Sequence, residues 1–475
     1  MSEYAEMLLD ADNSRLLVED EEGNEYEIDS KLGAGGQGAV YTLKNLPNLV
    51  VKMKLNECGN PLTSEEEYYK QLAVMERLIS LPDIPQTAVP LKVLKKPYIG
   101  YIMRLMEDMR PMEKEMIIEG NNNSISMHYL KTGGLSHRID ILLHLAEILS
   151  DMHNHGMVYC DISPKNIFVS ENVNHSQVWL IDTDNMHFGS DKQNATCIGT
   201  PLYRAPEVYR GEPNSYASDV YSFALLAYEY LTGNRAFNGE ACDADPDEDD
   251  WDDEPGTEID EDSGELPWIH DKQDNSNKTS AGYGIPWELI CTEKIQDLFH
   301  QTFTEGRKDP ALRPSMLEWK IALQEERLLI VQCQNKHAHL NNKCMWCNKE
   351  TVAYEVIASK IMPLVSEEEN SSFSIPVGHM KCAEVRGQPI EIPASILGND
   401  YSSHSLPIVS FYRQLQGYRI SLASNEVQKM SLKIYQDDKL ITPFATLKSI
   451  NKVEIRLLQN SKPVYIIQIK GGERA

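Results

Sequence analysis

Three polar residues in the middle of the chain are of types that can carry out chemistry on a phosphate. Residues 159–166 read YCDISPKN, which places Asp161 five positions before Asn166, and Asp182 follows two aliphatic residues sixteen positions further on. Two carboxylates and an amide offer the hard oxygen ligands that Mg²⁺ takes, whereas thiols and imidazoles do not. Because a transferred phosphoryl group is held mainly by charge and position, this set fits a phosphoryl-transfer site. Taken alone, a chance loop and hairpin is an equal alternative, and the surrounding segments favour the phosphoryl-transfer site.

A glycine-rich segment nearer the N-terminus could cover a nucleotide. Residues 32–41 read LGAGGQGAVY, and the backbone N–H groups of such a hairpin can approach phosphate oxygens because its glycines carry no Cβ. Lys52 ends an apolar run at the distance of the next strand but one, where it would be the cation for the phosphates. A flexible loop and a surface lysine are the alternatives. The residues predicted to contact the nucleotide are Leu32, Gly33, Ala34, Gly35, Gly36, Gln37, Gly38, Val40, Val50, Lys52, Glu67, Met103 and Leu105.

Three further segments carry a family resemblance. Residues 199–207 read GTPLYRAPE, residues 218–223 read SDVYSF and residues 309–315 read DPALRPS. In order and spacing, these segments and the two above resemble the eukaryotic-type (Hanks-type) protein kinases of bacteria. The resemblance implies an α+β bilobal fold with a β-rich N-lobe and a helical C-lobe, ATP and Mg²⁺ as cofactors, and a protein substrate. It also implies a structural ion pair between Glu207 and Arg313.

The resemblance assigns roles to the residues of the predicted site. Asp161 would be the catalytic base or the group that orients the attacking hydroxyl, and Asn166 and Asp182 would hold Mg²⁺. Lys52 would contact the α- and β-phosphates. Lys165 is a candidate contact for the γ-phosphate.

Two departures from the family pattern bear on regulation. The usual His-Arg before the catalytic Asp is Tyr159-Cys160 here, so the chain looks less dependent on phosphorylation of its activation loop. The usual Asp-Phe-Gly is Asp182-Thr183-Asp184, which keeps the metal ligand and loses the apolar plug. Asp184 adds a carboxylate that lies either near the metal or in a solvent-facing turn.

The acid that should pair with Lys52 is not in its usual place. Apolar residues at a helical period from Leu72 to Ile79 predict a helix whose register puts Gln71 at the pairing position. Glu67, one turn earlier on the same face, is the nearest acid; a solvated face is the alternative for it. A pseudokinase scaffold therefore stands as the competing function, beside kinase chemistry on a small molecule. The GTPLYRAPE segment favours Ser/Thr over Tyr as the target.

The negative charge of the chain is concentrated in one segment. The 475 residues carry a formal net charge of −27, and residues 243–265 hold fourteen acids and neither lysine nor arginine. A run of like charges repels itself and cannot bury a core, so we expect a solvated, mobile insertion at residues 240–265, or a docking arm for a basic partner. A net-acidic chain without a basic stripe argues against nucleic-acid binding.

Cysteine usage and hydropathy bear on the compartment. Nine cysteines, an odd number, do not form the framework of a secreted disulfide protein, so reduced thiols and a metal site fit better. The chain has no run of eighteen apolar residues and no charged-then-apolar leader. We expect a soluble cytoplasmic protein that binds no membrane.

A cluster of metal-ligating residues follows the kinase-like region. Cys344 and Cys347 form a CxxC pair, and Cys333 with either His337 or His339 lies within reach of it. Four protein ligands leave no open position, which predicts a structural Zn²⁺ held by Cys333, His337, Cys344 and Cys347. A redox CxxC is the alternative, but no βαβ pattern surrounds it.

This zinc knuckle narrows the resemblance to the kinases of bacterial tellurite-resistance-type operons. That family is associated with a von Willebrand A-domain protein and a metal-dependent Ser/Thr phosphatase, and the resemblance implies such partners.

The last third of the chain has the short alternating apolar runs of strands. Residues 453–469 predict a hairpin that turns at 459–462, and residues 433–441 predict another. The predicted division is an N-terminal extension (1–25), the kinase domain (26–330, with an N-lobe to about 105 and a C-lobe from about 106), the knuckle (331–350) and a β-rich domain (351–475).

Overall fold

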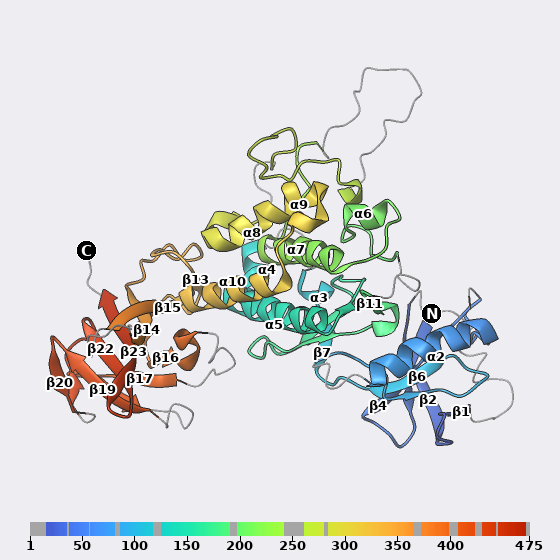
Figure 1. The fold of residues 1–475 in the computed structure, drawn as a ribbon, viewed down its shortest axis with the longest axis horizontal. Helices are drawn as coiled ribbons and strands as arrows, with labels where there is room; N and C mark the ends of the chain where they lie inside the picture. Colours follow the sequence, from blue (N-terminus) through green and yellow to red (C-terminus); the bar gives the residue numbers. More distant parts are fainter. Residues whose placement is uncertain are drawn as a thin grey trace.

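A computed structural model describes residues 16–35, 38–56, 58–80, 86–116, 125–190, 197–241, 261–279, 284–363, 372–398, 407–422, 430–442 and 445–471. A small β-rich N-lobe lies at one end of the molecule, a helical C-lobe occupies the middle, and a β-rich C-terminal domain lies at the other end (Figure 1). The two lobes and the β-rich C-terminal region agree with the predicted fold class.

The N-lobe is an antiparallel six-stranded sheet in the order β1-β2-β3-β4-β6-β5, covered by one long helix. Apolar side chains alternate along its strands, so Ala39, Tyr41 and Leu43 are all buried on one face. The predicted helix is present as α2. The elements are β1 Leu17–Glu19, β2 Glu25–Gly35, β3 Gly38–Leu43, β4 Leu49–Met53, α2 Glu65–Ser80, β5 Lys92–Val93 and β6 Gly100–Arg104.

The N-lobe sheet begins earlier in the chain than predicted. Strand β1 falls within residues 1–25, which were assigned to an extension, and it pairs with β2 so that Val18 enters the core. Three residues are too short a run to show a strand period, so only the pairing with β2 reveals β1.

The C-lobe is built around two buried helices, α5 and α7. Both carry apolar residues on nearly every face, as expected of helices enclosed by protein. Ser215 begins α7 with a capping box, and Gly233 ends it at φ 72°. The helices are α3 Glu113–Met116, α4 Ile125–Lys131, α5 Gly134–Asn154, α6 Pro206–Tyr209, α7 Tyr216–Thr232, α8 Glu293–Phe303, α9 Glu305–Lys308 and α10 Met316–Leu329, with 3₁₀ turns η1 Thr183–Asn185, η2 Glu261–Ser263, η3 Trp287–Leu289 and η4 Pro310–Leu312.

Short strands of the C-lobe carry the loops of the predicted site. One sheet has the order β10-β9-β7, and β11 pairs with β8. Between β8 and β9 lies the YCDISPKN segment, and between β10 and β11 lies Asp182. The strands are β7 Met109–Pro111, β8 Met157–Val158, β9 Ile167–Ser170, β10 Val178–Leu180 and β11 His187–Phe188.

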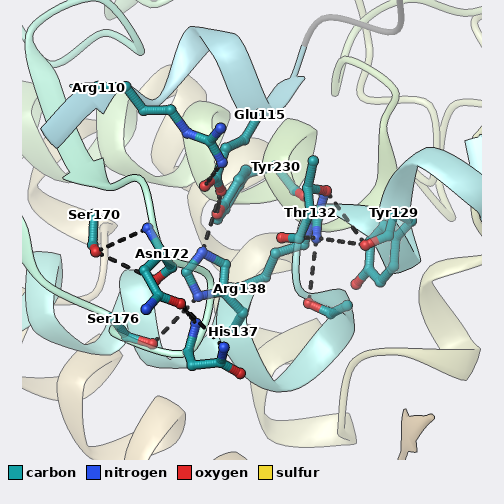
Figure 2. Close-up of polar contacts among 12 residues, drawn as sticks. Arg110, Glu115, Tyr129, Thr132, His137, Arg138, Ser170, Asn172, Ser176 and Tyr230 are labelled. Atoms are coloured by element: carbon teal, nitrogen blue, oxygen red, sulfur yellow. Dashed lines mark hydrogen bonds and ion pairs between the residues drawn. The ribbon is translucent and has the colours of Figure 1, made fainter. Parts of the chain in front are cut away.

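A buried polar network anchors α3 inside the C-lobe (Figure 2). The carboxylate of Glu115 accepts hydrogen bonds from Arg110 at 2.9 Å and from the Tyr230 hydroxyl at 2.5 Å, and His137 lies 3.3 Å away. Burial alone would raise the pKa of Glu115, but the hydrogen bonds from His137, Tyr230 and Arg110 hold it below its usual value. Beside it, Arg138 donates to backbone oxygens of α4, α5 and α7. The network therefore joins the segment after the N-lobe to the two central helices.

The acidic insertion is only partly described, and its described end corrects the expectation of a fully solvated segment. Residues 242–260 lie outside the described part of the chain. Asp262, in η2, is 3% exposed, because its carboxylate is paired with Arg204. The apolar pattern then resumes as expected, and Trp268 is fully buried.

The Cys/His segment packs onto the C-lobe. Strands β12 Val331–Gln332 and β13 Ala338–His339 form a two-stranded ladder. Ala338 and Leu340 belong to the same hydrophobic core as α5 and α7, and the Trp346 ring lies 5.2 Å from that of Tyr129. The segment assigned to a separate knuckle (331–350) thus shares the core of the lobe before it.

The C-terminal domain is a sandwich of two antiparallel sheets around its own core. The orders are β15-β14-β23-β22-β19-β20 and β16-β17-β18-β21. Both predicted hairpins are confirmed, and Asp437-Asp438 and Asn460-Ser461 turn with positive φ. The elements are β14 Ala353–Pro363, β15 Ser372–Ala383, β16 Ile390–Pro393, η5 Ala394–Leu397, β17 Pro407–Gln414, β18 Gly417–Leu422, β19 Ser431–Gln436, β20 Lys439–Ile441, β21 Thr446–Leu447, β22 Val453–Gln459 and β23 Lys462–Gly471.

Within the described residues, no helix combines the length and apolarity needed to cross a membrane.

A buried acid on α10, Glu326, makes the stability of the C-lobe depend on pH. One carboxylate oxygen of Glu326 accepts from the N–H of Thr292 at 2.9 Å and from its hydroxyl at 2.7 Å, at the start of α8. The other oxygen is buried without a hydrogen-bond partner. Burial raises the pKa of Glu326 to about 7, although the Thr292 bonds oppose the shift.

We predict that Glu326→Gln stabilises the protein at high pH. Since the pKa of Glu326 is raised in the folded state, its contribution is fully present below pH 4.5 and is lost as the pH rises through about 7. The variant should match wild type at pH 5 and exceed its unfolding free energy by about 2–3 kcal/mol at pH 8, measured in urea. The exposed neighbour Glu325, changed to Gln, should show no such pH-dependent gain; equal profiles for the two variants would contradict the prediction.

Candidate active site

Asp161 lies in a loop where its carboxylate is held from two sides. Asn166 Nδ2 donates to Asp161 Oδ2 at 2.8 Å and to its backbone oxygen at 3.0 Å. Thr200 donates to Asp161 Oδ1 from its N–H at 2.9 Å and from its hydroxyl at 2.7 Å. These bonds fix the orientation of the Asp161 carboxylate, as a group that accepts a proton from a substrate requires. They also use the amide nitrogen of Asn166, which leaves its Oδ1 as the atom that could face a cation.

The loop that carries Asp161 is fixed to α7 by a buried carboxylate. Asp219 accepts from the N–H of Tyr159 at 2.8 Å and from that of Cys160 at 2.9 Å. Cys160 has φ 80°, a backbone conformation that non-glycine residues rarely adopt. The hydrogen bonds to Asp219 offset the conformational energy of this strained backbone. His153 lies 3.0 Å from the same carboxylate. The geometry of the catalytic candidate therefore depends on α7.

Tyr159 connects this loop to the segment that carries Asp182. Its hydroxyl donates to the backbone oxygen of Ile181. Burial, and then the nearby Asp182, Asp161 and Asp219, raise the pKa of Tyr159 well above its usual value, so the hydroxyl keeps its proton. Asp182 itself has φ 63° at the start of η1. Tyr159 thus joins the loop that carries Asp161 to the segment that carries Asp182.

Lys52 and Asp182 meet across the two lobes. The Nζ of Lys52 pairs with Asp182 Oδ1, and the Lys52 side chain is 9% exposed. The pair brings the predicted phosphate cation and the predicted metal ligand into contact, although they are far apart in the sequence.

The predicted pairing of Glu67 with Lys52 is wrong. Glu67 instead pairs with Lys54 at 2.9 Å and accepts from Gln71 at 3.5 Å. Side chains of a strand alternate between its two faces, so Lys52 and Lys54 share one face of β4 and its extension, and Lys54 reaches the first turn of α2 where Glu67 lies. Gln71, one turn further along, is buried and has no charge. Glu67, in the first turn of α2, therefore pairs with Lys54 and not with Lys52.

The predicted lid forms the β2–β3 hairpin. Gly35 pairs with Gly38 at its end. Gly36 and Gln37 lie outside the described residues. A Cβ at Gly38 would lie 2.3 Å from the backbone oxygen of Met53, so only glycine fits where β3 begins beside the end of β4.

The other residues predicted to contact the nucleotide line the N-lobe sheet. Val50 is buried and Val40 half-buried on the neighbouring strands β4 and β3. Met103 packs in a small cluster under α2, and the Leu105 N–H donates to Asn48. Leu32 is 56% exposed, and Gly33 and Ala34, which follow it in β2, are exposed as well.

Lys165 lies at the surface beside the catalytic loop. Its side chain is 67% exposed, and its Nζ is 3.7 Å from Glu113 of α3. The Asp184 side chain lies outside the described part of the structure. The structure therefore places Lys165 next to Asn166 without fixing its ammonium.

The ion pair implied for Glu207 and Arg313 is confirmed. Two nearly parallel bonds, at 2.6 and 2.8 Å, join them inside the C-lobe, and Arg313 also donates to Gly306 and Ala217. The pair ties α6 to the segment before α10.

The four predicted zinc ligands converge in one place. The ligand atoms of Cys333, His337, Cys344 and Cys347 lie within 4.8 Å of one another. Cys333 Sγ and Cys347 Sγ are 3.6 Å apart, and Cys344 Sγ is 3.7 Å from His337 Nδ1. Bonds of about 2.3 Å to sulfur and about 2.0 Å to nitrogen place the corners of a tetrahedral zinc site about 3.5–3.8 Å apart. His339 instead contacts Thr351 at 3.0 Å, in agreement with the preference for His337.

Thr200 and Asp219 were missed as site residues. Both stand in the quoted segments GTPLYRAPE and SDVYSF, so the signal was available. An acid at the start of a helix as apolar as α7 needs a buried partner, and that requirement could have marked Asp219.

Comparison with known proteins agrees with these motifs. Residues 26–321 match the family model described as the protein kinase domain. Serine/threonine-protein kinase PknB of Mycolicibacterium smegmatis is 38% identical over 110 residues, which cover 22% of this chain and 17% of the relative. Serine/threonine-protein kinase pkn2 of Myxococcus xanthus is 25% identical over 223 residues, covering 45% of this chain and 25% of the relative. The chain thus spans a quarter or less of the length of these two relatives.

We predict that Asp219→Ala destabilises the fold through the catalytic loop. The change leaves two buried N–H groups without their acceptor, which should cost about 2–5 kcal/mol of unfolding free energy in denaturant titrations. Asp219→Asn keeps one acceptor and should lose about half as much. Asp297→Ala, at an exposed position on α8, should stay within about 0.5 kcal/mol of wild type; a similar value for Asp219→Ala would disprove the anchoring role.

Proposed function

This chain belongs to the protein kinase family, and on that premise we propose that it transfers the γ-phosphate of ATP to serine or threonine hydroxyls of itself or a protein substrate, with Mg²⁺. The observation that carries the proposal is the Asp161 carboxylate, held by Asn166 and Thr200 on a loop that Asp219 fixes. The serine/threonine kinases among its relatives support the class of hydroxyl.

In the proposed reaction, each residue acts through its position. Asp161 accepts a hydrogen bond from the substrate hydroxyl and aims its oxygen at the phosphorus. Asn166 Oδ1 and the Asp182 carboxylate are the oxygen atoms that would hold Mg²⁺, which neutralises phosphate charge when bound. Lys52 supplies a second positive charge beside Asp182. The β2–β3 hairpin covers the phosphates.

A nucleotide-binding scaffold is the second candidate function. One observation favours it: Glu67 pairs with Lys54, and uncharged Gln71 is buried at the position expected to be acidic. Lys52 instead pairs with Asp182, a residue that the metal would also need. Such a protein would bind ATP without transferring phosphate.

We further propose that Cys333, His337, Cys344 and Cys347 bind a structural zinc ion. The convergence of their ligand atoms supports this set, and four protein ligands leave no position for substrate. The site holds together the short segment on which Trp346 packs against Tyr129 of the C-lobe. Zinc here would stabilise the C-lobe rather than take part in phosphate transfer.

Partners and setting remain proposals that the family resemblance alone supports. A von Willebrand A-domain protein, a metal-dependent Ser/Thr phosphatase and a role in bacterial signalling follow from the likeness to tellurite-resistance-type kinases. A recognition or assembly role for the C-terminal domain is consistent with its separate core.

Asp161→Asn tests the proposed chemistry. We expect a fall in phosphate transfer of at least ~10³-fold, because the amide cannot accept the proton, while ATP binding is retained. Purified protein with radiolabelled ATP and Mg²⁺, followed by phosphoamino-acid analysis, measures transfer and its target residue. Asp151→Asn, on the surface side of α5, is the control. Wild type that binds ATP but labels neither itself nor a basic protein would favour the scaffold.

Metal analysis tests the zinc proposal. We expect about one zinc per chain in the purified protein, lost in Cys344→Ser along with a drop of several degrees in the melting temperature. Cys58→Ser, at an exposed cysteine, should keep both. Full zinc in Cys344→Ser, or none in wild type purified without chelator, would refute the site.

A further inference from the structure

The described end of the acidic insertion lies against the activation segment. One oxygen of the Asp262 carboxylate accepts from the Leu202 N–H at 3.0 Å and from Arg204 at 3.0 Å (Nε) and 2.9 Å (Nη2). Asp262 is 3% exposed, so these contacts are shielded from water. A charge-assisted bond of this kind is stronger than a neutral one. A residue of the insertion therefore holds two residues of the segment that carries Thr200.

A second contact fixes the same end of the insertion. Gly264, at φ 75°, packs so closely on Pro206 that a Cβ there would lie 2.7 Å from the proline ring. Glu261 pairs with Arg235 at 3.0 Å, just beyond α7. Residues 261–264 thus make three separate contacts with the C-lobe, through Glu261, Asp262 and Gly264. The contacts of Glu261 and Gly264 hold Asp262 in place.

The residues that Asp262 holds have an unusual conformation. Leu202 has φ 74° and is 39% exposed, a strained backbone with an apolar side chain presented to solvent. Two positions earlier, Thr200 donates both its bonds to Asp161. Leu202 therefore presents an exposed apolar side chain two positions from Thr200, which contacts the Asp161 carboxylate, and a peptide substrate can lie on such a surface. The bond from its N–H to Asp262 keeps Leu202 in this conformation.

We propose that Asp262 is a positioning residue, which holds residues 200–204 in the shape that receives a peptide substrate without a phosphate on the activation segment. This inference rests on the proposed kinase function. A phosphate orders such a segment by giving an arginine a negatively charged partner. Here the Asp262 carboxylate already pairs with the Arg204 guanidinium. The negatively charged partner that a phosphate would supply is therefore a residue of the chain itself.

Asp262→Ala and Asp262→Asn test the role in the full-length protein. In a kinase assay with a serine peptide, we expect Asp262→Ala to raise the peptide KM at least ~10-fold, with the KM for ATP unchanged, since the lost contact holds the peptide surface alone. Asp262→Asn keeps an acceptor for Leu202 and should fall between. Glu265→Gln removes the same charge from an exposed position of the insertion and should match wild type. Phosphatase-treated wild type should keep its activity.

Hydrogen exchange separates this inference from the proposed function. In Asp262→Ala, the Leu202 amide should exchange at least ~10-fold faster than in wild type, while amides of α7 keep their protection. The faster exchange at Leu202 is expected even if the wild type transfers no phosphate. A wild type without transferase activity would contradict the kinase proposal but not the positioning role of Asp262. Unchanged exchange at Leu202 would overturn the positioning role. So would a peptide KM equal to that of Glu265→Gln, or loss of activity on phosphatase treatment.

Discussion

The carboxylate of Asp219 is the constraint on which the candidate site depends. It sits at the start of α7, a helix buried on nearly all sides, and accepts the N–H groups of Tyr159 and Cys160. With that support, Cys160 keeps its positive φ and Asp161 turns toward Asn166 and Thr200. The Tyr159 hydroxyl donates to the backbone oxygen of Ile181, and this bond links the loop to the residue before Asp182. Without the buried acid, the residues of the candidate site would not be held in one arrangement.

Other buried charges of the C-lobe serve as joints between distant segments. Glu207 and Arg313 join α6 to the chain before α10, and Glu115 joins α3 to α5 and α7. Removing water from such groups is costly, so they add little net stability compared with apolar packing. What they provide is a single arrangement, because any shift would leave a buried charge without its partner. Glu326 differs from them, since one of its oxygens is buried without a hydrogen-bond partner.

The sequence predicted well what depends on local pattern and poorly what depends on how elements meet. The motif residues, α2, the two C-terminal hairpins and the Cys/His cluster were all foreseen, because each has a period or spacing of its own. The pairing of Glu67 with Lys54 was not, since it depends on how β4 and α2 are placed against each other. Asp262 was hidden for another reason: the composition of residues 243–265 predicts solvation, and one acid among fourteen departs from that average.

Helix α10 makes the kinase domain and the C-terminal domain thermodynamically dependent on each other. Its Trp319 and Leu323 lie in the core of the C-lobe, while Leu328, near its end, packs against the core of the C-terminal sandwich. Only Ile330 separates α10 from β12, and the Cys/His segment that follows returns to the C-lobe core. The two cores are therefore joined by one rigid element instead of a flexible tether. A partner that binds only the folded sandwich would therefore also stabilise the C-lobe, and a ligand that binds only the folded C-lobe would stabilise the sandwich.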